Sequence, residues 1–493
     1  MYKMKRRDFI KTGSSALAGG ALLGAGSVFT SACGTPCPEG DIDLGSTDVL
    51  VVGGGPAGVC AAIAAARNGA RTVIAEQGNC LGGMATRGLV APFMTCYDTT
   101  GETMVIRGLF EEVVDRMVAL GGAIHPSLVR AGTPFSAWIG PGHDHLTPFD
   151  AETMKYVLDQ MCSEAGVKVM FHTGFVEPLL KGTTVRGIRV LNREGLCKIA
   201  AKVVIDATGD GDVAARAGAP YTYGNPDIGK VQPATLFFHI NNVDTPRLIA
   251  EVEAHLHEFR KVDGVSYRAL HWRVEEAEAA GEWDISRKSV NIYRGVREDE
   301  WAVNCTRIAD VDATSTESLS EAEREGRRQV QEMLNFFHKY VPGCENATIK
   351  SSASTLGIRE SRHIQGEYLL TADDLLQGVV PEDSILVASN SVDVHGRNGA
   401  NTTEYRTVEK GRWYGLPLRS LIPAGIDGLI VAGRAISASS DAAGAVRVMP
   451  PCMAMGHAAG IAAAIAAASG TAPRNVDAAE VRRRLLAEKA FLG

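Results

Sequence analysis

Apolar and polar positions along the chain predict an α/β fold that begins with a βαβ unit. Asp48–Val52 is an almost continuous apolar run, which is typical of a strand buried on both faces of a parallel sheet. An Ala-rich helix is expected from Ala57 to Asn68, and a second strand over Arg71–Glu76. Because strand, helix and strand follow one another within about thirty residues, we expect a parallel sheet with helices on both faces.

The middle of the chain predicts a helix followed by several strands. The helix spans Asp150–Ala165, where Asp150 is a suitable N-cap. Strands are expected over Val167–Met170, Val185–Leu191 and Val203–Ile205. The last of these strands leads directly into a polar turn that contains glycine.

Residues 219–351 change to scattered strands and charged helices. One helix is expected near 246–283, broken at Gly264, and another over 317–340. This block has no nucleotide-binding signature. We therefore interpret it as an α+β substrate or cap domain.

From Ile385 onward the pattern of short apolar strands and Ala-rich helices resembles that of the first part of the chain. A short apolar strand is expected over Leu429–Ala432, and a helix from about Met453 to Ser469. We therefore expect two parts of one cofactor-binding domain, 48–218 and 352–493, with the α+β block inserted between them.

The first residues of the chain resemble a twin-arginine export signal. Lys5–Lys11 holds the pair Arg6–Arg7, and an apolar, Gly/Ala-rich stretch follows from about Thr12 to Ala32. Its weak hydrophobicity is typical of such signals, and its glycines make it a poor permanent membrane span. We therefore expect residues 1–32 to be a signal peptide that directs the protein to the periplasm or the cell surface. This route carries folded proteins, so a cofactor can be inserted before export.

A short tether, residues 33–47, is expected between the signal and the first strand. Thr30–Cys33 resembles a bacterial lipobox with Cys33 as the lipidated residue, although Thr30 stands where Leu or Val is usual. Thr30 and Ala32 also suit ordinary signal-peptidase cleavage. Attachment to a membrane through a lipid on Cys33 and simple cleavage therefore both stay open.

Charge and composition argue against nucleic acid as a partner. The 493 residues carry a formal net charge of −7, and aromatic side chains make up only 6% of them. Most of the ten cysteines stand singly within apolar patterns, as buried small hydrophobic residues do. The twelve histidines do not cluster with cysteines at zinc-like spacing, so we expect no metal site.

A dinucleotide-binding fingerprint follows the first strand directly. Gly53, Gly55 and Gly58 fall in the pattern GxGxxG. The first glycine permits a tight turn, the second lets the backbone approach a pyrophosphate, and the third lets helix and strand pack closely. The pyrophosphate meets the helix N-terminus, whose N–H groups lack partners. Glu76, at the end of the second strand, is placed to accept both hydroxyls of an adenosine ribose.

Two further segments favour FAD over NAD, which shares this fingerprint. Ala207–Gly209, at the end of a strand, resembles the ATG motif of glutathione-reductase-like flavoproteins. Gly433 and Arg434 follow a late strand and resemble the turn that reaches the ribityl chain of FAD in those proteins. NAD dehydrogenases do not need this last segment. We therefore expect a Rossmann-like domain that binds FAD.

The C-terminal third resembles a bacterial family described as FAD-dependent oxidoreductases. The resemblance rests on Gly357–Tyr368, Asp393–Gly396, Leu416–Pro423, Ala432–Ser437 and Arg447–Gly460, and it extends over nearly the whole chain after Thr47. It implies the fold and the cofactor, whereas the substrates of the family are mostly undefined. Together with the motifs above, it implies a set of residues that contact FAD: Gly53, Gly55, Pro56, Ala57, Gly58, Glu76, Gly82, Gly83, Met84, Val176, Ala207, Thr208, Gly209, Gly433, Arg434, Ala454 and Met455.

The candidates for chemistry lie in the same C-terminal third. A reduced flavin benefits from a positive field at its N1–C2=O edge, and the amides of Ala454 and Met455 at a helix start are candidates to supply it. His395 lies in a Gly/Asn-rich loop, and an imidazole with a pKa near neutrality suits a proton donor or acceptor. His363 and Tyr405 are weaker candidates, and a structural role for His395 is the alternative.

Three arginines are candidates for binding an anionic substrate. Arg359 and Arg362 are three residues apart, so on a helix or turn they share a face and suit a carboxylate. Ion pairs with Glu360 or Glu367 are the alternative. Arg447 is a candidate for contact with a substrate carboxylate or with the flavin, and a surface salt bridge is its alternative.

These features predict an exported FAD-dependent oxidoreductase that transfers a hydride between an organic small molecule and FAD. NAD(P)H is scarce outside the cytoplasm, so a quinone, a cytochrome or an organic acceptor is the expected electron partner. An electron-transfer subunit of a membrane-associated redox complex is the alternative, although the inserted block argues for a substrate pocket. A non-catalytic FAD-binding protein also stays open. The residues do not set the substrate or the direction of transfer.

Overall fold

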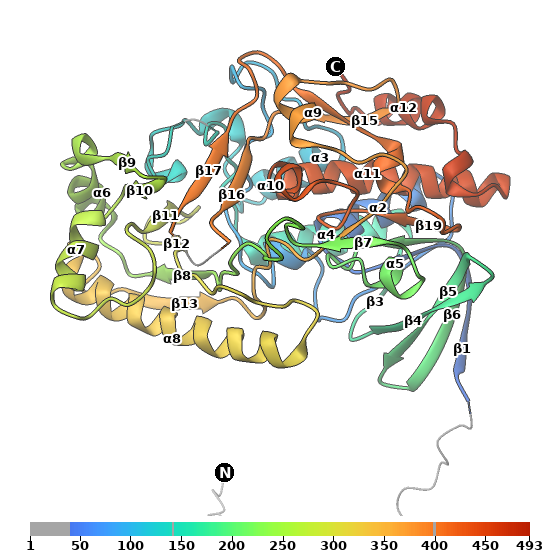
Figure 1. Cartoon of the computed structure of the whole chain (residues 1–493), viewed down its shortest axis with the longest axis horizontal. Coiled ribbons are helices and arrows are strands. Elements are labelled where there is room, and N and C mark those ends of the chain that lie inside the picture. The colour runs from blue at the N-terminus through green and yellow to red at the C-terminus, as the bar shows by residue number, and fades with distance from the viewer. Residues whose placement is uncertain (1–39, 141, 398–400) are drawn as a thin grey trace, which may run out of the picture. The chain divides into compact units, whose positions relative to one another are not determined.

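A sheet of seven strands organises the part of the protein that carries the dinucleotide fingerprint. The protein is described by a computed structural model over residues 40–140, 142–397 and 401–493. The strand order is β3-β2-β1-β6-β5-β4, and β19 pairs with the end of β6 (Figure 1). The strands are β1 (Ile42–Val52), β2 (Thr72–Ala75), β3 (Lys168–Met170), β4 (Gly174–Lys181), β5 (Thr184–Asn192), β6 (Gly195–Asp206) and β19 (Leu429–Val431). β19, β6, β1, β2 and β3 run parallel, whereas β4, β5 and β6 form an antiparallel meander.

The register of the parallel strands brings three chain segments to one edge of the sheet. Val52, the last residue of β1, lies opposite Asp206, the last residue of β6. Asp206 in turn lies opposite Val431, the last residue of β19. The turns that follow these strands therefore lie side by side, although some 380 residues separate the first from the last. Ligands of parallel α/β sheets bind at such a carboxyl edge.

The helix α11 (Met449–Ser469) packs along α2 (Pro56–Arg67), and the two lie together in Figure 1. Glycines permit this close approach: a Cβ at Gly456 would collide with the carbonyl oxygen of Ala57, and one at Gly460 with that of Ala61. Within the described residues, α11 is long and apolar enough to cross a membrane, but 78% of its apolar window is buried in the protein. Its apolar character is thus accounted for by its place in the core.

A second sheet, of four strands, lies in the block predicted from the sequence to be a substrate or cap domain. Its strand order is β11-β12-β8-β13, and all its pairs are antiparallel. The long helix α8 (Thr316–Tyr340) runs beside β13 (Figure 1) and begins at Ser315, whose hydroxyl accepts from the N–H of Ser318. The strands are β8 (Phe238–Asn241), β11 (Asn291–Arg294), β12 (Trp301–Asn304) and β13 (Thr348–Ser352).

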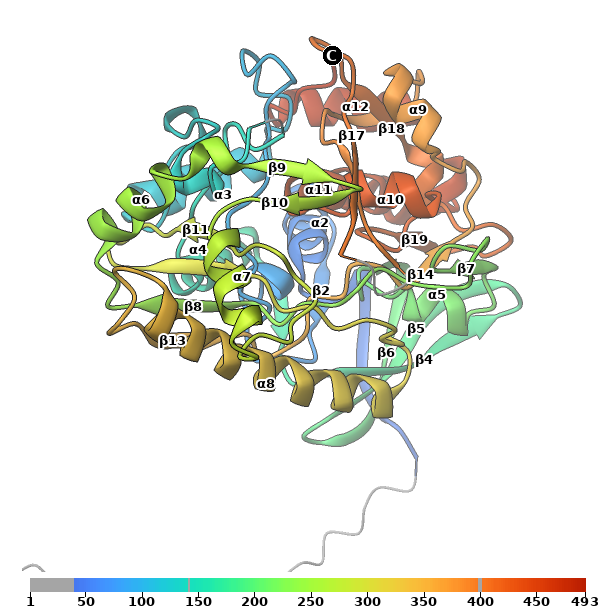
Figure 2. The ribbon, with the colours of Figure 1, turned by 60° about the vertical axis from the view of Figure 1, so that its left-hand side comes forward.

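Two hairpins meet on one side of the molecule. The hairpin β9–β10 touches the hairpin β16–β17 through a bridge between Val265 and Thr402, and the Lys261 ammonium donates to the carbonyl of Thr403 over 2.9 Å (Figure 2). These hairpins form a wall of the site described below. Their strands are β9 (Arg260–Val262), β10 (Val265–Tyr267), β16 (Val392–His395) and β17 (Thr403–Arg406).

The remaining elements complete the layers around the two sheets. Two further strand pairs are antiparallel, β7 with β14 and β15 with β18. Their bounds are β7 (Tyr221–Tyr223), β14 (Arg362–Ile364), β15 (Ser384–Ala388) and β18 (Tyr414–Pro417). The other helices are α3 (Leu109–Ala119), α4 (Ala151–Ala165), α5 (Asp212–Arg216), α6 (Thr245–Glu253), α7 (His271–Ala279), α9 (Ala372–Gln377), α10 (Ser440–Val446) and α12 (Ala478–Ala487).

The mixed α/β architecture confirms the predicted fold class, and several predicted boundaries change. β1 begins at Ile42, six residues before Asp48, because its first residues pair with β6 from Cys197 onward. The end of the predicted tether is therefore part of the sheet. The helix predicted near 246–283 is two helices, α6 and α7, separated by the β9–β10 hairpin with Gly264 in its turn.

The predicted signal, Arg6–Arg7 and the lipidation site Cys33 lie outside the described residues. Residues 42–493 form one compact unit by their contacts. The role of residues 219–351 as a substrate domain stays a prediction. The eight cysteines of the described residues are all free and buried, as their apolar surroundings predicted.

Replacing Gly460 with leucine should destabilise the protein by about 1–3 kcal/mol, because the side chain has no room between α11 and α2. The melting temperature, followed by circular dichroism, measures this loss. Ala468→Leu is the control, because Ala468 is exposed on the same helix. Equal melting temperatures for the two variants would contradict the packing described here.

Candidate functional site

One cavity of about 690 Å³ follows the edge of the sheet where β1, β6 and β19 end. Its volume is typical of sites for small molecules and cofactors. One end is lined by residues of the three turns that follow these strands, of the start of α2 and of the segment after β2, among them Gly53, Gly55, Pro56, Ala57, Glu76, Gly83, Met84, Ala207, Thr208, Gly209, Gly433 and Arg434. The other end is lined by polar residues from the hairpins and the second sheet, among them Arg268, Arg287, Asn291, Arg359, Asp393, His395, Tyr405 and Arg447.

The glycines of the fingerprint play three different roles. Gly53 has a φ of +98°, and a Cβ there would lie 2.5 Å from the carbonyl oxygen of Ala207. At Gly58 a Cβ would collide with the carbonyl oxygen of Gly53, so this glycine lets α2 pack against the turn. At Gly55 a Cβ would meet nothing within 4 Å, although the residue lines the cavity. The backbone at Gly55 is therefore open to a ligand, whereas the other two glycines serve the fold.

The start of α2 fits a pyrophosphate. Gly55 is the N-cap, no side chain caps the helix, and Pro56 occupies the first turn. The free N–H groups of a helix start attract an anion through hydrogen bonds and through the helix dipole. The open space at Gly55 and the uncapped helix agree with the phosphate-binding role that the sequence predicted.

Glu76 is held in place by the chain itself. Its carboxylate accepts from the N–H of Gly54 over 2.7 Å, from the N–H of Gly78 over 2.6 Å and from Arg87 over 3.1 Å. It is 5% exposed and lines the cavity. A fixed carboxylate in this position suits the ribose hydroxyls of an adenosine.

The ATG segment is tied to the late turn by an ion pair. Arg434 donates to the carboxylate of Asp210 over 2.5 Å. Asp206 stabilises the turn of the ATG segment. Its carboxylate accepts from the N–H of Thr208 over 3.1 Å and from the N–H of Ala214 over 2.9 Å. Burial raises the pKa of Asp206 to about 6. Asp206 directly precedes the ATG segment in the sequence, but only the structure shows that its carboxylate stabilises the turn.

Three other predicted cofactor residues do not line the cavity and act through their neighbours. Gly58 is the packing glycine already described. Gly82 has a φ of +100° and caps the short helix that contains Gly83 and Met84. The carbonyl of Val176 accepts a hydrogen bond from Arg216, which does line the cavity.

Ala454 and Met455 are not placed at the cavity, which corrects the prediction for their amides. The helix starts at Met449 rather than near Met453, so both N–H groups lie beyond the first turn and bond within the helix. The residues that line the cavity are Val448 and Met449. Their amides are the ones at the helix start, because the next two residues are prolines without an N–H.

His395 lies at the end of β16 and faces the polar end of the cavity. Its side chain is 12% exposed. Its Nδ1 lies 3.3 Å from the hydroxyl of Thr403, and its Nε2 lies 3.6 Å from the carboxylate of Asp393. The backbone N–H of His395 donates to the side-chain oxygen of Gln232 over 3.1 Å. The imidazole is thus oriented by its neighbours within reach of a bound ligand.

The charge around His395 differs from what the sequence predicted. Burial lowers its pKa well below 6.5, and the positive charges of Arg359, Arg287, Arg447 and Arg307 lower it further. The imidazole is therefore neutral at neutral pH and suited to accept a proton. The expectation of a pKa near neutrality was wrong because these arginines are distant in the sequence.

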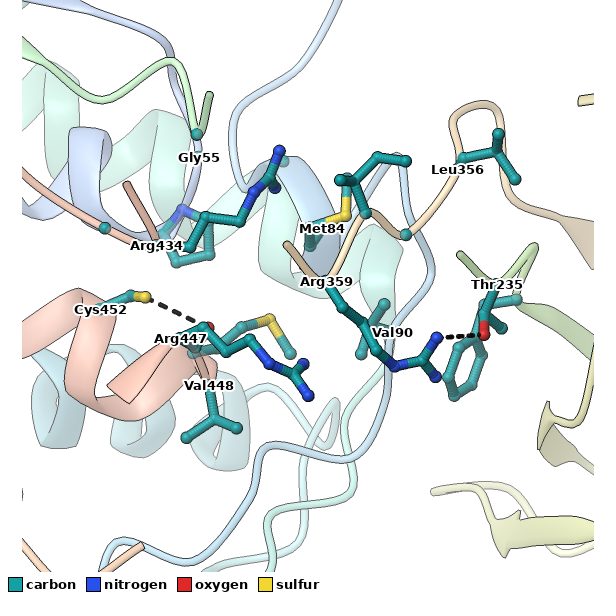
Figure 3. Close-up of a pocket in the computed structure, with 18 of the residues that line it drawn as sticks. Gly55, Met84, Val90, Thr235, Leu356, Arg359, Arg434, Arg447, Val448 and Cys452 are labelled. Atoms are coloured by element: carbon teal, nitrogen blue, oxygen red, sulfur yellow. Dashed lines mark hydrogen bonds between the residues drawn. The ribbon is translucent and has the colours of Figure 1, made fainter. Parts of the chain in front are cut away.

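Arg359 and Arg362 do not share a face. Arg359 lies in an irregular segment and donates to the carbonyl of Pro233 over 2.6 Å and to the hydroxyl of Thr235 over 2.8 Å (Figure 3). Arg362 is the first residue of β14 and forms an ion pair with Asp212 over 2.8 Å. Arg359 lines the cavity and Arg362 does not, so the paired clamp predicted from their spacing is wrong.

The predicted ion-pair alternatives also change. Glu360 is buried and pairs with Arg397 over 3.1 Å and with His363 over 3.3 Å. Glu367 pairs with Arg474 over 2.7 Å instead of with Arg362. His363 is consequently part of a buried polar network and does not line the cavity.

Arg447 and Tyr405 both line the cavity, as candidates for ligand contact should. Arg447 stands just before α11, beside Val448 and Cys452 (Figure 3). It is not a surface salt bridge, since its side chain is 14% exposed and its nearest carboxylate, Asp393, lies 4.0 Å away. Burial raises the pKa of Tyr405 to about 12, so its hydroxyl stays protonated.

Sequence reasoning missed Arg287, Arg268 and Gln232. Arg287 lines the cavity from the loop between α7 and β11, and it is 9% exposed. Gln232 orients His395 from the segment before β8. No motif surrounds these residues, so the place of Arg287 and Gln232 beside His395, and of Arg268 in the cavity lining, follows only from the tertiary fold.

Comparison with known proteins identifies the family. The model of the FAD-dependent oxidoreductase family matches residues 48–485, so the protein belongs to this family, and its cofactor is FAD. A thiamine thiazole synthase of Aeropyrum pernix is 30% identical over 181 residues, which are 34% of this chain and 57% of that protein. The chain thus spans little more than half of the length of this curated relative.

Two solved structures are similar to this chain over most of its length. A geranylgeranyl bacteriochlorophyll reductase-like protein of Thermoplasma acidophilum is 14% identical, with 90% of this chain and 84% of that chain covered and a TM-score of 0.40. The p-nitrophenol 4-monooxygenase of Pseudomonas putida is 13% identical, with 91% and 87% covered and a TM-score of 0.44.

Gly55→Val should abolish FAD retention and leave the fold intact, because the new side chain enters the cavity and meets no protein atom within 4 Å of its Cβ. Absorbance near the flavin bands, relative to protein absorbance, measures retention, and circular dichroism measures folding. Gly53→Val is the contrasting variant and should impair folding itself, because of its positive φ and its contact with Ala207. A yellow Gly55→Val protein with full FAD content would contradict this assignment.

Proposed function

We propose that this FAD-dependent enzyme transfers a hydride between an organic small molecule and its flavin, and that His395 handles the accompanying proton. The observation that carries the proposal is the single cavity, which extends from the FAD-binding turns to a polar wall with His395 and the arginines. A pure electron-transfer subunit needs no such extension. The electron-transfer reading is therefore the second choice.

FAD supplies, when bound, the group that accepts or donates the hydride. The residues of this chain supply charge stabilisation and proton transfer. Val448 and Met449 present helix-start amides, which favour negative charge beside them. With an alcohol or amine as substrate, the neutral imidazole of His395 would accept the O–H or N–H proton, and the hydride from the substrate carbon is what FAD would accept.

We further propose that the protein acts outside the cytoplasm and belongs with the glutathione-reductase-like flavoproteins. The twin-arginine pattern at Arg6–Arg7 supports export, and the fingerprint with the ATG segment supports the kinship. Outside the cytoplasm nicotinamide cofactors are scarce. A quinone, a cytochrome or an organic acceptor is accordingly the proposed electron partner, and a lipid on Cys33 would hold the protein at a membrane.

His395→Gln should slow reduction of the flavin by a substrate on the order of 100-fold, because general-base catalysis is lost. Anaerobic stopped-flow absorbance of the holoenzyme, mixed with a panel of alcohols, amines and sugars, finds the substrate and measures this rate. His257→Gln is the control, since His257 is exposed and does not line the cavity. Reoxidation of the chemically reduced protein by small-molecule acceptors tests the reverse direction.

The pH profile gives a second readout for His395. Its folded pKa is lowered below 6.5, so the base stays neutral as pH falls through 6.5. We therefore expect kcat/KM for substrate oxidation to lose no activity near pH 6.5 through this group, because kcat/KM reports the free enzyme. A loss of kcat/KM with a midpoint near 6.5 that is absent in His395→Gln would mean that His395 is the base but keeps an ordinary pKa, which would contradict the lowering of its pKa by the arginines. Flavin that no small molecule reduces or reoxidises would favour the electron-transfer reading.

Replacing both Arg6 and Arg7 with lysine should retain the FAD-loaded protein in the cytoplasm, because the export machinery reads the arginine pair and not the charge alone. Cell fractionation followed by immunoblotting measures the distribution. Lys11→Arg, which leaves the pair intact, is the control. Export of the double variant at the unaltered rate would refute the twin-arginine route.

A further inference from the structure

The polar end of the cavity holds more arginines than carboxylates. Arg268, Arg287, Arg359 and Arg447 line it together with Lys261, and Arg307 is buried close enough to act on the same groups. Asp393 is the carboxylate that lines this end. The other acidic residues of the lining have partners elsewhere: Glu76 with Arg87, Asp210 with Arg434, Asp212 with Arg362, and Glu323 with Arg327.

Three of the lining arginines, Arg287, Arg359 and Arg447, keep hydrogen-bond donors without a charged acceptor. Arg359 donates only to neutral oxygens, those of Pro233 and Thr235. For the side chain of Arg287, no hydrogen bond or ion pair occurs within the described residues, and its Nε is buried without a partner. The Nε of Arg447 is likewise buried without a partner, and its Nη2 lies 3.3 Å from the carbonyl of Asp393.

Such an arrangement is costly for the protein alone. Burial lowers the pKa of Arg359 well below 12.5, and the charges of Arg447, Arg287 and Arg307 lower it further. Elsewhere the fold neutralises a buried arginine with a carboxylate, as Arg397 shows with Glu360. Buried charges without a partner in the protein indicate a site where a ligand of opposite charge neutralises them.

The phosphates of FAD do not account for this charge. They belong at the start of α2, where Gly55 leaves the backbone open. Arg434 stands near this end in Figure 3, whereas Arg359 reaches toward Thr235 of the second sheet block. Arg287 comes from that block as well, between α7 and β11.

We propose that the substrate is a small organic molecule with two anionic groups, bound by Arg287, Arg359 and Arg447. Asp393 offsets one charge of these three arginines, so two of their positive charges remain for the ligand, beside those of Arg268 and Lys261 in the same lining. Arginine's planar fork suits both carboxylate and phosphate oxygens. This inference rests on the proposed function, since it names the substrate class of the same site.

Binding of a dianion also changes the surroundings of His395. The charged groups that face it are Arg287, Arg307, Arg359, Arg447 and Asp393. An anion among the arginines weakens their repulsion of a proton on the imidazole. The holoenzyme should therefore take up protons when the ligand binds, and His395→Gln should take up fewer.

The test is a titration of the holoenzyme with succinate, butyrate and glycerol phosphate, followed by flavin absorbance and by calorimetry in buffers of different ionisation enthalpy. Succinate and butyrate have the same carbon chain and differ by one carboxylate. We expect the dianions to bind at least about tenfold more tightly than butyrate, and Arg287→Met and Arg359→Lys to weaken the dianions by about tenfold or more. Succinate ahead of glycerol phosphate identifies a dicarboxylate, and the reverse order a phosphate ester.

Stability separates a binding role from a structural one. Within the described residues the side chain of Arg287 makes no hydrogen bond or ion pair, so Arg287→Met without ligand should melt at the same temperature as the unaltered protein or higher. Succinate should raise the melting temperature of the unaltered protein more than that of the variant. Arg247→Gln is the control for net charge, because Arg247 pairs with Glu345 at the surface. It should bind dianions like the unaltered protein.

Two results would overturn the proposal. One is equal affinity for succinate, glycerol phosphate and butyrate, and the other is unchanged dianion affinity in both arginine variants. If such a protein is still reduced by neutral molecules, the oxidoreductase proposal stands and only the substrate class is wrong. If dianions bind through the arginines but no small molecule changes the redox state of the flavin, the proposed hydride transfer is wrong and the anion site stands.

Discussion

The structure depends on the close approach of backbones around one strand-turn-helix segment. Gly53 touches the chain that leaves β6, Gly58 lets α2 pack onto the turn, and Gly456 and Gly460 let α11 pack onto α2. Each contact brings a main chain to a distance that any Cβ would prevent. The same packing brings α2 and α11 together, and the starts of both helices line the cavity. The cofactor end of the site is therefore a direct consequence of how the core is packed.

The two ends of the cavity follow different physical rules. At the cofactor end each charged side chain is fixed by a partner, as Glu76 is by two backbone N–H groups and Asp210 by Arg434. That end is rigid and electrically balanced before a ligand arrives. At the other end, arginines face one another across a polar space with one carboxylate between them. A preorganised surplus of charge gives affinity for anions at the expense of stability in the free protein.

The position of His395 links the excess positive charge of the arginines to the proposed proton transfer. An imidazole on a strand end can act as a base only if its proton affinity matches the task, and here the field of the arginines sets it. Asp393 and Thr403 hold the ring, and Gln232 holds its backbone. In the function we propose, substrate binding and proton transfer are coupled through charge rather than through movement of the chain.

The sequence by itself determined the fold class, the FAD turn and most of the residues at the cofactor end. These features are local: a buried strand, a glycine pattern and a helix follow within one short segment, and their physical roles can be assigned from spacing. Helix starts were less certain, because Pro450 and Pro451 favour a start at Met449 that the apolar pattern does not mark. Only the tertiary structure decided the substrate end. Arg287 and Arg359 meet His395 from distant segments, and both the pKa of a group and its partners depend on what lies nearby in space rather than along the chain.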